Sequence, residues 1–286
     1  MIVIVYYNST KRKRIMSNKF EYSDFEKQKN KELESLFSDW IKQLSKNKTP
    51  IDNGNKRKKT PAACFAKDGF FPGYFDENNL RVCFIGRETR LIGGYDFRDT
   101  TKEFFDDPDP KNSWWRRILK IMYGIQNNGE IEFEKLNTIN ILNEMYDSNK
   151  YGFAVINISK FSNDHPNNWE SNTNLIDRFL KDSELDKRNF FNEELEILSP
   201  DVIITANLWN GLIKEEYLNL CLPESNFQKT KNIIHNRESI AEYGKYNLNS
   251  KIIDFIDLYH FSTPGKSDKY CYYNPVMKVL FNKNRK

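Results

Sequence analysis

The sequence predicts an α/β protein, a three-layer α/β/α sandwich around a central four-stranded parallel sheet. Short apolar runs rich in valine and isoleucine recur along the chain, and helix-like segments separate them. Most of these runs are nearly continuous in apolar residues, as strands covered on both faces tend to be. Right-handed crossovers between parallel strands place helices on both faces of such a sheet.

Length and composition are compatible with one large folded domain. The 286 residues include 38% hydrophobic and 14% aromatic residues, which suffices for one substantial core. The net charge of +4, from 44 basic and 40 acidic residues, does not by itself indicate a nucleic-acid partner. The four cysteines form no CxxC pair, which argues against a zinc or iron–sulfur site and favours a reduced, cytoplasmic protein.

Residues 1–60 are expected to form an N-terminal tail, an amphipathic helix and a basic linker, ahead of a domain at 61–286. The opening MIVIVYY is too short to span a membrane, and its basic run follows the apolar stretch, unlike that of a signal peptide. No membrane association is expected, and Met16 is an alternative start. Apolar residues at helical spacing predict the helix over 23–44, and the polar stretch at 45–61 predicts the linker.

Four apolar runs mark the predicted strands. They are LRVCFIG at 80–86, GFAVINIS at 152–159, PDVIITA at 200–206 and IIDFIDLYH at 252–260. The helices predicted between them are SWWRRILKIMYGI at 113–125, NLIDRFLKD at 174–182 and RNFFNEELEIL at 188–198. In an open parallel sheet, sites form beyond the carboxyl ends of the strands. The residues that follow the four runs are therefore the first candidates for function.

Three polar residues lie at or near the ends of these runs. Glu88 follows the glycine that ends the first run, although a surface ion pair with Arg87 or Arg90 explains it equally well. Asn157 is a lone amide in an apolar run; it caps a loop or offers the donor and acceptor that reading a base edge requires. His260 begins a loop, where it has a structural role or titrates and donates.

In order along the chain, these motifs resemble those of the uracil-DNA glycosylase superfamily. GRETR at 86–90 stands at the place of a first motif of the type GQDPYH, and Asn157 in VINISKF matches the base-reading asparagine. LSPDVIITA matches a third strand of the type L-x-P-x-V-I-I, and HFS at 260–262 matches a His-Pro-Ser motif. FIGRET, WWRRI and NISKF are especially similar to a bacterial branch whose first motif reads G-K-E-T. The resemblance covers about residues 60–286.

The resemblance implies a monofunctional DNA glycosylase that acts on double- or single-stranded DNA without a metal or organic cofactor. Such a reaction breaks the bond between a flipped-out base and its deoxyribose through an oxocarbenium-like sugar, which a carboxylate stabilises. Glu88 takes this role by position, and His260 donates to the departing base. The residues expected to bind the base are Asn157, Arg87 and Arg90, with Tyr95 or Phe97 stacking on it. The residues expected to contact DNA are Ser262, Pro264, Lys266, Arg116 and Arg117.

Departures from the family pattern bear on the substrate. Glu88 replaces the usual aspartate, and Phe261 replaces the proline of His-Pro-Ser, with Pro264 where a wedge leucine is expected. Arg90 stands in place of a tyrosine that blocks 5-substituted pyrimidines. We therefore expect a larger base, such as the 5-hydroxymethylated or glucosylated cytosines of phage DNA, and a role in antiphage defence. The alternatives are repair of uracil or deaminated bases, and a non-catalytic DNA-binding module with the same fold.

Overall fold

The computed structural model describes residues 21–55, 59–99, 112–148, 150–166, 170–185, 188–208 and 213–281. The opening MIVIVYY, Met16 and most of the basic run before residue 59 lie outside the described residues. The expectations that concern them are therefore not addressed by the structure.

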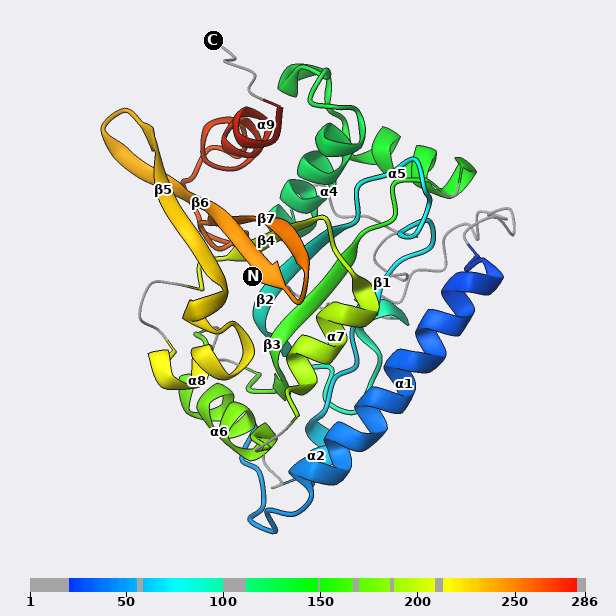
Figure 1. Cartoon of the computed structure of the whole chain (residues 1–286), viewed down its shortest axis with the longest axis vertical. Helices are drawn as coiled ribbons and strands as arrows, with labels where there is room; N and C mark the ends of the chain where they lie inside the picture. Colours follow the sequence, from blue (N-terminus) through cyan, green and yellow to red (C-terminus); the bar gives the residue numbers. More distant parts are fainter. Residues whose placement is uncertain are drawn as a thin grey trace.

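A seven-stranded mixed sheet forms the centre of the molecule (Figure 1). Its strands lie in the order β1-β3-β2-β4-β7-β6-β5. The strands β3, β2, β4 and β7 are parallel to one another, whereas β1, β6 and β5 pair antiparallel. The strand bounds are β1 Gly69–Phe70, β2 Val82–Arg90, β3 Ala154–Asn163, β4 Val202–Ala206, β5 Phe227–His235, β6 Glu238–Leu248 and β7 Lys251–Leu258.

The four apolar runs form the four parallel strands, but the prediction of a four-stranded sheet is wrong in the number of strands. β5 and β6 were not predicted because polar and charged residues are interspersed along both. Antiparallel strands with one face toward solvent show this mixed pattern, so they lack the continuous apolar run by which buried parallel strands are recognised. The missed β1 has only two residues.

Helices pack against both faces of the sheet (Figure 1). The helices predicted at 113–125, 174–182 and 188–198 are confirmed as α4, α6 and α7. None of the helices in the described part of the chain is long and apolar enough to cross a membrane. The helix bounds are α1 Asp24–Leu44, α2 Pro61–Cys64, α4 Ser113–Gln126, α5 Thr138–Ser148, α6 Thr173–Ser183, α7 Phe190–Leu198, α8 Glu215–Cys221 and α9 Asn274–Phe281, with short helical turns η1 Phe133–Lys135, η2 Glu224–Asn226 and η3 Asp268–Tyr273.

Each face of the sheet contributes to its own apolar core. Alternation along β2 sends Cys83 and Ile85 into the core shared with α1, α6, α7 and α8. Val82 and Phe84 enter the core shared with α4, α5, η3 and α9. Full burial of one large apolar side chain contributes about 1.5–3 kcal/mol, so both cores stabilise the parallel strands whose ends carry the candidate site.

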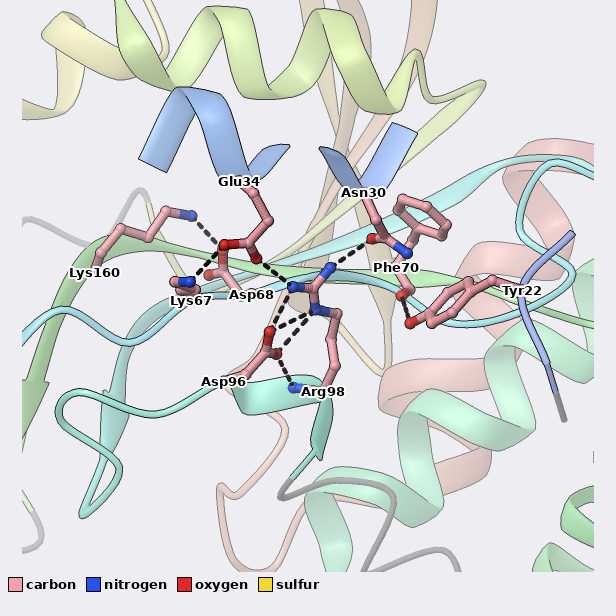
Figure 2. Close-up of polar contacts among 9 residues, drawn as sticks. All are labelled: Tyr22, Asn30, Glu34, Lys67, Asp68, Phe70, Asp96, Arg98 and Lys160. Carbon is pink, nitrogen blue, oxygen red and sulfur yellow. Dashed lines mark hydrogen bonds and ion pairs between the residues drawn. The ribbon is translucent and has the colours of Figure 1, made fainter. Parts of the chain in front are cut away.

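The N-terminal helix α1 belongs to the same core as the rest of the described chain. A capping box at Ser23 and Glu26 starts the helix, and Trp40, 1% exposed, stacks on Phe190 of α7 with ring centroids 5.3 Å apart. On its polar side, Arg98 donates to Asn30 at 2.6 Å and to Glu34 at 3.2 Å (Figure 2). The helix is therefore packed into the domain, and it holds the residues around Arg98 through these hydrogen bonds.

Candidate active site

The strand order places a topological switch point beside β2. The chain runs from β2 to β3 on one side and then crosses to β4 on the other, and ligands bind at such a point beyond the carboxyl ends of the strands. Arg87 connects β2 to the loop directly after β4, because its Nη2 donates to the carbonyl of Asn207 at 2.5 Å. Arg87 is 8% exposed, so it is packed at this end of the sheet.

Asn157 lies on β3 opposite Gly86 of β2 and is 3% exposed. Its backbone N and its Nδ2 both donate to Asp68 Oδ2, at 2.7 Å and 3.5 Å. Because a carboxylate only accepts, Nδ2 faces Asp68. The amide oxygen points the other way, and a Cβ added to Gly86 would lie 2.6 Å from it. The expected strand end at Gly86 is wrong, since β2 continues to Arg90, and this glycine is needed for the close approach of Asn157.

A fully buried cluster of charged residues supports Asn157. Lys160 Nζ lies 2.7 Å from Asp68 Oδ1 and 2.7 Å from Glu194 Oε2 of α7, and all three residues are 0% exposed. Burial opposes the charge on Lys160, but the two carboxylates outweigh it and raise its pKa. Burial also raises the pKa of Glu194 well above its ordinary value, which favours a protonated Glu194 and a cluster without net charge. Figure 2 shows the Lys160–Asp68 pair beside the polar contacts of α1.

Glu88 lies two residues beyond Gly86 and therefore on the same face of β2. Its Oε1 accepts from Asn163 Nδ2 at 3.2 Å and from the backbone N of Asn172, the N-cap of α6, at 2.9 Å. Its Oε2 is buried and accepts no hydrogen bond from the described residues. Burial raises the pKa of Glu88, and the bonds from Asn172 and Asn163 offset part of that shift. One oxygen is thus held in place by two hydrogen bonds, while the other is buried without one.

His260 follows β7, and its ring lies 5.2 Å from that of Trp114, centroid to centroid. Burial, together with the nearby charge of Arg87, lowers the pKa of His260 to about 4, so the imidazole is neutral at pH 7. The backbone N of Ser262 donates to its Nδ1 at 3.2 Å. The proton of the neutral ring therefore sits on Nε2, which makes Nε2 a hydrogen-bond donor. Trp114 also lies beside Gly86, within 3.3 Å of a Cβ built there, and so links His260 to the β2–β3 end.

The loop after His260 is held by Arg117 of α4. Its guanidinium donates to the carbonyls of Phe261, Thr263 and Lys266 at 2.6, 3.1 and 2.8 Å, and its Nε to Asp268 at 2.8 Å. Arg117 is 4% exposed. The structure thus uses this guanidinium to hold the loop, which leaves Arg117 less available to phosphates than the sequence suggested.

The remaining candidates lie around this centre with different exposures. Arg116 is half-buried and forms an ion pair with Asp268 at 2.6 Å, which leaves it less available to phosphates than the sequence suggested. Phe97 stacks on Trp115 at 5.7 Å, as part of the core packing, whereas Tyr95 is 71% exposed. Pro264 is exposed.

Two further basic side chains at this edge are held by neighbours. Lys266 lies over the ring of Tyr259, with Nζ 4.2 Å from the centroid. Arg90 donates to the carbonyls of Glu170 and His165 at 3.1 and 3.3 Å, so it points toward the segment between β3 and α6.

The supporting residues were not found from the sequence. Asp68, Lys160 and Glu194 stand in three separate segments, and only the isolated lysine in NISKF hinted at a buried charge. Within the described ranges, no group of three or more histidine, cysteine or acidic residues is arranged to hold a metal ion. No family model matches the chain, and neither a curated protein nor a solved structure matches it.

Proposed function

We propose that the protein is a monofunctional DNA glycosylase that flips out and excises a modified pyrimidine, leaving an abasic site. The observation that carries this proposal is the placement of Glu88, Asn157 and His260 on three parallel strands or directly after one, each fixed by a neighbouring hydrogen bond. The three-layer architecture of the glycosylase superfamily is part of the proposal, and helices on both faces of the sheet support it.

The reaction is a hydrolysis at C1′ of the target nucleotide. The bond between C1′ and the base nitrogen breaks, water adds its oxygen to C1′, and a water proton ends on the base. The free Oε2 of Glu88, when ionised, stabilises the positive charge on the sugar and orients the water. His260 donates its Nε2 proton in a hydrogen bond to the carbonyl of the departing base. A neutral imidazole with a pKa of about 4 donates without ionising at pH 7.

Recognition of the base falls to Asn157. The contact of Nδ2 with Asp68 orients the side-chain amide, so its Nδ2 and its oxygen face a ligand in one orientation only. A fixed amide discriminates between bases because the wrong edge leaves buried polar groups without partners. The flipped base is read in this way along its hydrogen-bonding edge.

The size of the base depends on position 90. Arg90 donates to two backbone carbonyls of the segment between β3 and α6, which supports a site that its side chain leaves open to a 5-substituent. A hydroxymethylated or glucosylated cytosine of phage DNA fits such an opening, and antiphage defence is the corresponding role. Repair of uracil by a relaxed enzyme and a non-catalytic DNA-binding module are the competing functions.

A panel of oligonucleotides decides among these functions. Single- and double-stranded DNA carrying one uracil, cytosine, 5-hydroxymethylcytosine or glucosylated 5-hydroxymethylcytosine is incubated with the protein, and abasic sites are cleaved with alkali. We expect cleavage at a modified cytosine and none at plain cytosine. Cleavage at uracil alone assigns the protein to repair, and DNA binding without any cleavage assigns it to the binding modules.

A further inference from the structure

The β5–β6 hairpin extends beyond the carboxyl ends of the parallel strands, the side of the sheet that carries the candidate site. Ala241 of β6 pairs with Leu258 at the carboxyl end of β7, so the residues before Ala241 lie beyond that end. His235 and Glu238 are the last pair before the turn. The tip of the hairpin, residues 234–239, therefore lies beyond the carboxyl end of β7, and the parallel strands β2 and β3 end on the same side of the sheet. Figure 1 shows the β5–β6 hairpin extending away from the sheet.

Three contacts attach this tip to the segment that follows β7. Tyr259 OH donates to the carbonyl of Ser239 at 3.1 Å. The ring of His235 stacks on Tyr270 with centroids 4.9 Å apart and planes 9° apart. Lys266 Nζ lies 4.0 Å from a carboxylate oxygen of Glu238. The tip and the His260 loop thus form one continuous surface at the border of the site.

The turn of the hairpin is built from residues that strain it. Asn236 and Arg237 have φ of 49° and 68°, as a two-residue turn of type I′ requires. Asparagine followed by glycine is preferred there, and a side chain with a Cβ costs about 1–2 kcal/mol in this conformation. Arg237 is exposed and makes no hydrogen bond or ion pair with any residue that the structure describes. An exposed arginine at a position that suits glycine better motivates the hypothesis that its side chain has a function.

We propose that the β5–β6 tip is a DNA-contacting element, in which Arg237 binds a phosphate of the duplex beside the flipped nucleotide. This inference rests on the proposed function, since it requires DNA at the carboxyl edge of the sheet. Exposed Asn236 and Ile234, the latter 55% exposed, flank the arginine and offer polar and apolar contacts to the same groove. A two-stranded antiparallel ribbon has the width to enter the major groove.

The test replaces Arg237 with glycine, which removes the guanidinium and suits the left-handed backbone, so the hairpin is retained. Asn249→Gly is the matched control, because Asn249 has φ of 56° in the β6–β7 turn at the opposite edge of the sheet. Lys31→Ala removes an exposed positive charge from α1. Binding of each variant to a duplex with one 5-hydroxymethylcytosine is measured between 50 and 200 mM salt, and excision is measured in single turnover at saturating enzyme.

Loss of one phosphate contact reduces the slope of log affinity against log salt by about 0.9. Arg237→Gly should therefore bind more weakly, with a salt-induced loss that is about 3.5-fold smaller between 50 and 200 mM. Its saturated excision rate should stay at that of the parent. If the affinity and the salt slope of Arg237→Gly equal those of the parent, the inference is overturned. Excision of a base by the parent still supports the glycosylase in that case. If Arg237→Gly binds more weakly than the parent but the parent excises no base, the inference is supported and the glycosylase is rejected. A parent that does not bind DNA contradicts both.

Discussion

Asn157 within β3 and His260 after β7 both present a polar group to the candidate site, but the protein fixes them by different means. Behind Asn157 lies a charged cluster removed from water, in which Lys160 lies between Asp68 and Glu194. Behind His260 lies the guanidinium of Arg117, which donates hydrogen bonds to three backbone carbonyls and to Asp268. The first arrangement orients one side chain within a strand, whereas the second shapes an entire loop.

This difference separates effects on folding from effects on the site. A buried charge that loses its partner is costly wherever it lies, because it can no longer be solvated. The guanidinium of Arg117 acts mainly through geometry, and if it is lost, Asp268 still pairs with Arg116, so that carboxylate keeps a cation. We therefore expect changes behind Asn157 to affect stability most, and changes behind His260 to affect excision more than stability.

The largest expected effect follows from Lys160→Met. It leaves Asp68 without its cation in an apolar surrounding, and we expect the free energy of unfolding to fall by about 3–5 kcal/mol. Lys67→Met is the control, because Lys67 forms a partly exposed ion pair with Glu34 and its loss should cost about 1 kcal/mol or less. Urea denaturation measures both. Equal losses in the two variants contradict the role assigned to the buried cluster.

A smaller effect on stability is expected for Arg117→Lys. Lysine keeps the charge but cannot serve the carbonyls of Phe261, Thr263 and Lys266 together, so we expect a loss of about 1–2 kcal/mol. The excision rate should fall by about tenfold, because a displaced His260 that raises the activation free energy by about 1.4 kcal/mol corresponds to that factor. Arg116→Lys, at the neighbouring half-buried arginine, should change neither by more than a small amount. A stable Arg117→Lys protein with full excision rejects the view that this loop is held by the guanidinium.

The direction of the Asn157 amide gives a narrower prediction. In Asp68→Asn, Glu194 remains to pair with Lys160, and the new amide can accept or donate, so Asn157 is free to turn around. We expect the preference between bases with a 4-amino and a 4-oxo group to shrink by about tenfold, while the folded protein still binds DNA. Asp164→Asn is the control, since Asp164 is also buried and paired with a lysine but does not contact Asn157. The ratio of kcat/KM for matched cytosine and uracil derivatives reports the change.

The smallest expected effect concerns the stability contributed by Glu88. Its pKa is raised in the folded protein, so the protonated form is favoured there, and stability is lost as pH rises above the unfolded value of about 4.3. Glu88→Gln removes that loss and keeps an oxygen for Asn163 and Asn172. It should be slightly more stable than the parent at pH 7, by about 0.5–1 kcal/mol, and equal to it below about pH 4. A variant that melts lower at pH 7 contradicts this sign.

Much of the sheet but little of its support was predictable from the sequence. Buried parallel strands are recognised in a sequence as apolar runs. Because sites form near the carboxyl ends of such strands, these runs led directly to Glu88, Asn157 and His260. The antiparallel β5 and β6 were missed because their mixed polar pattern resembles a loop. Arg117 was taken for a surface charge, since its burial depends on carbonyls about 145 to 150 positions away. Contacts between distant segments, such as Asp68 with Lys160, leave no periodic signal in a single sequence.

The measurement that tests the central claim most directly is single-turnover excision by Glu88→Gln compared with Glu77→Gln. Glu77 is exposed and lies before β2, away from the strand ends, so its change controls for the loss of one carboxylate. On the base that the parent excises best, we predict a fall of about 10²- to 10³-fold for Glu88→Gln with unchanged DNA affinity, and the parent rate for Glu77→Gln. Equal rates in the two variants would show that the carboxylate at the end of β2 does not carry out the reaction.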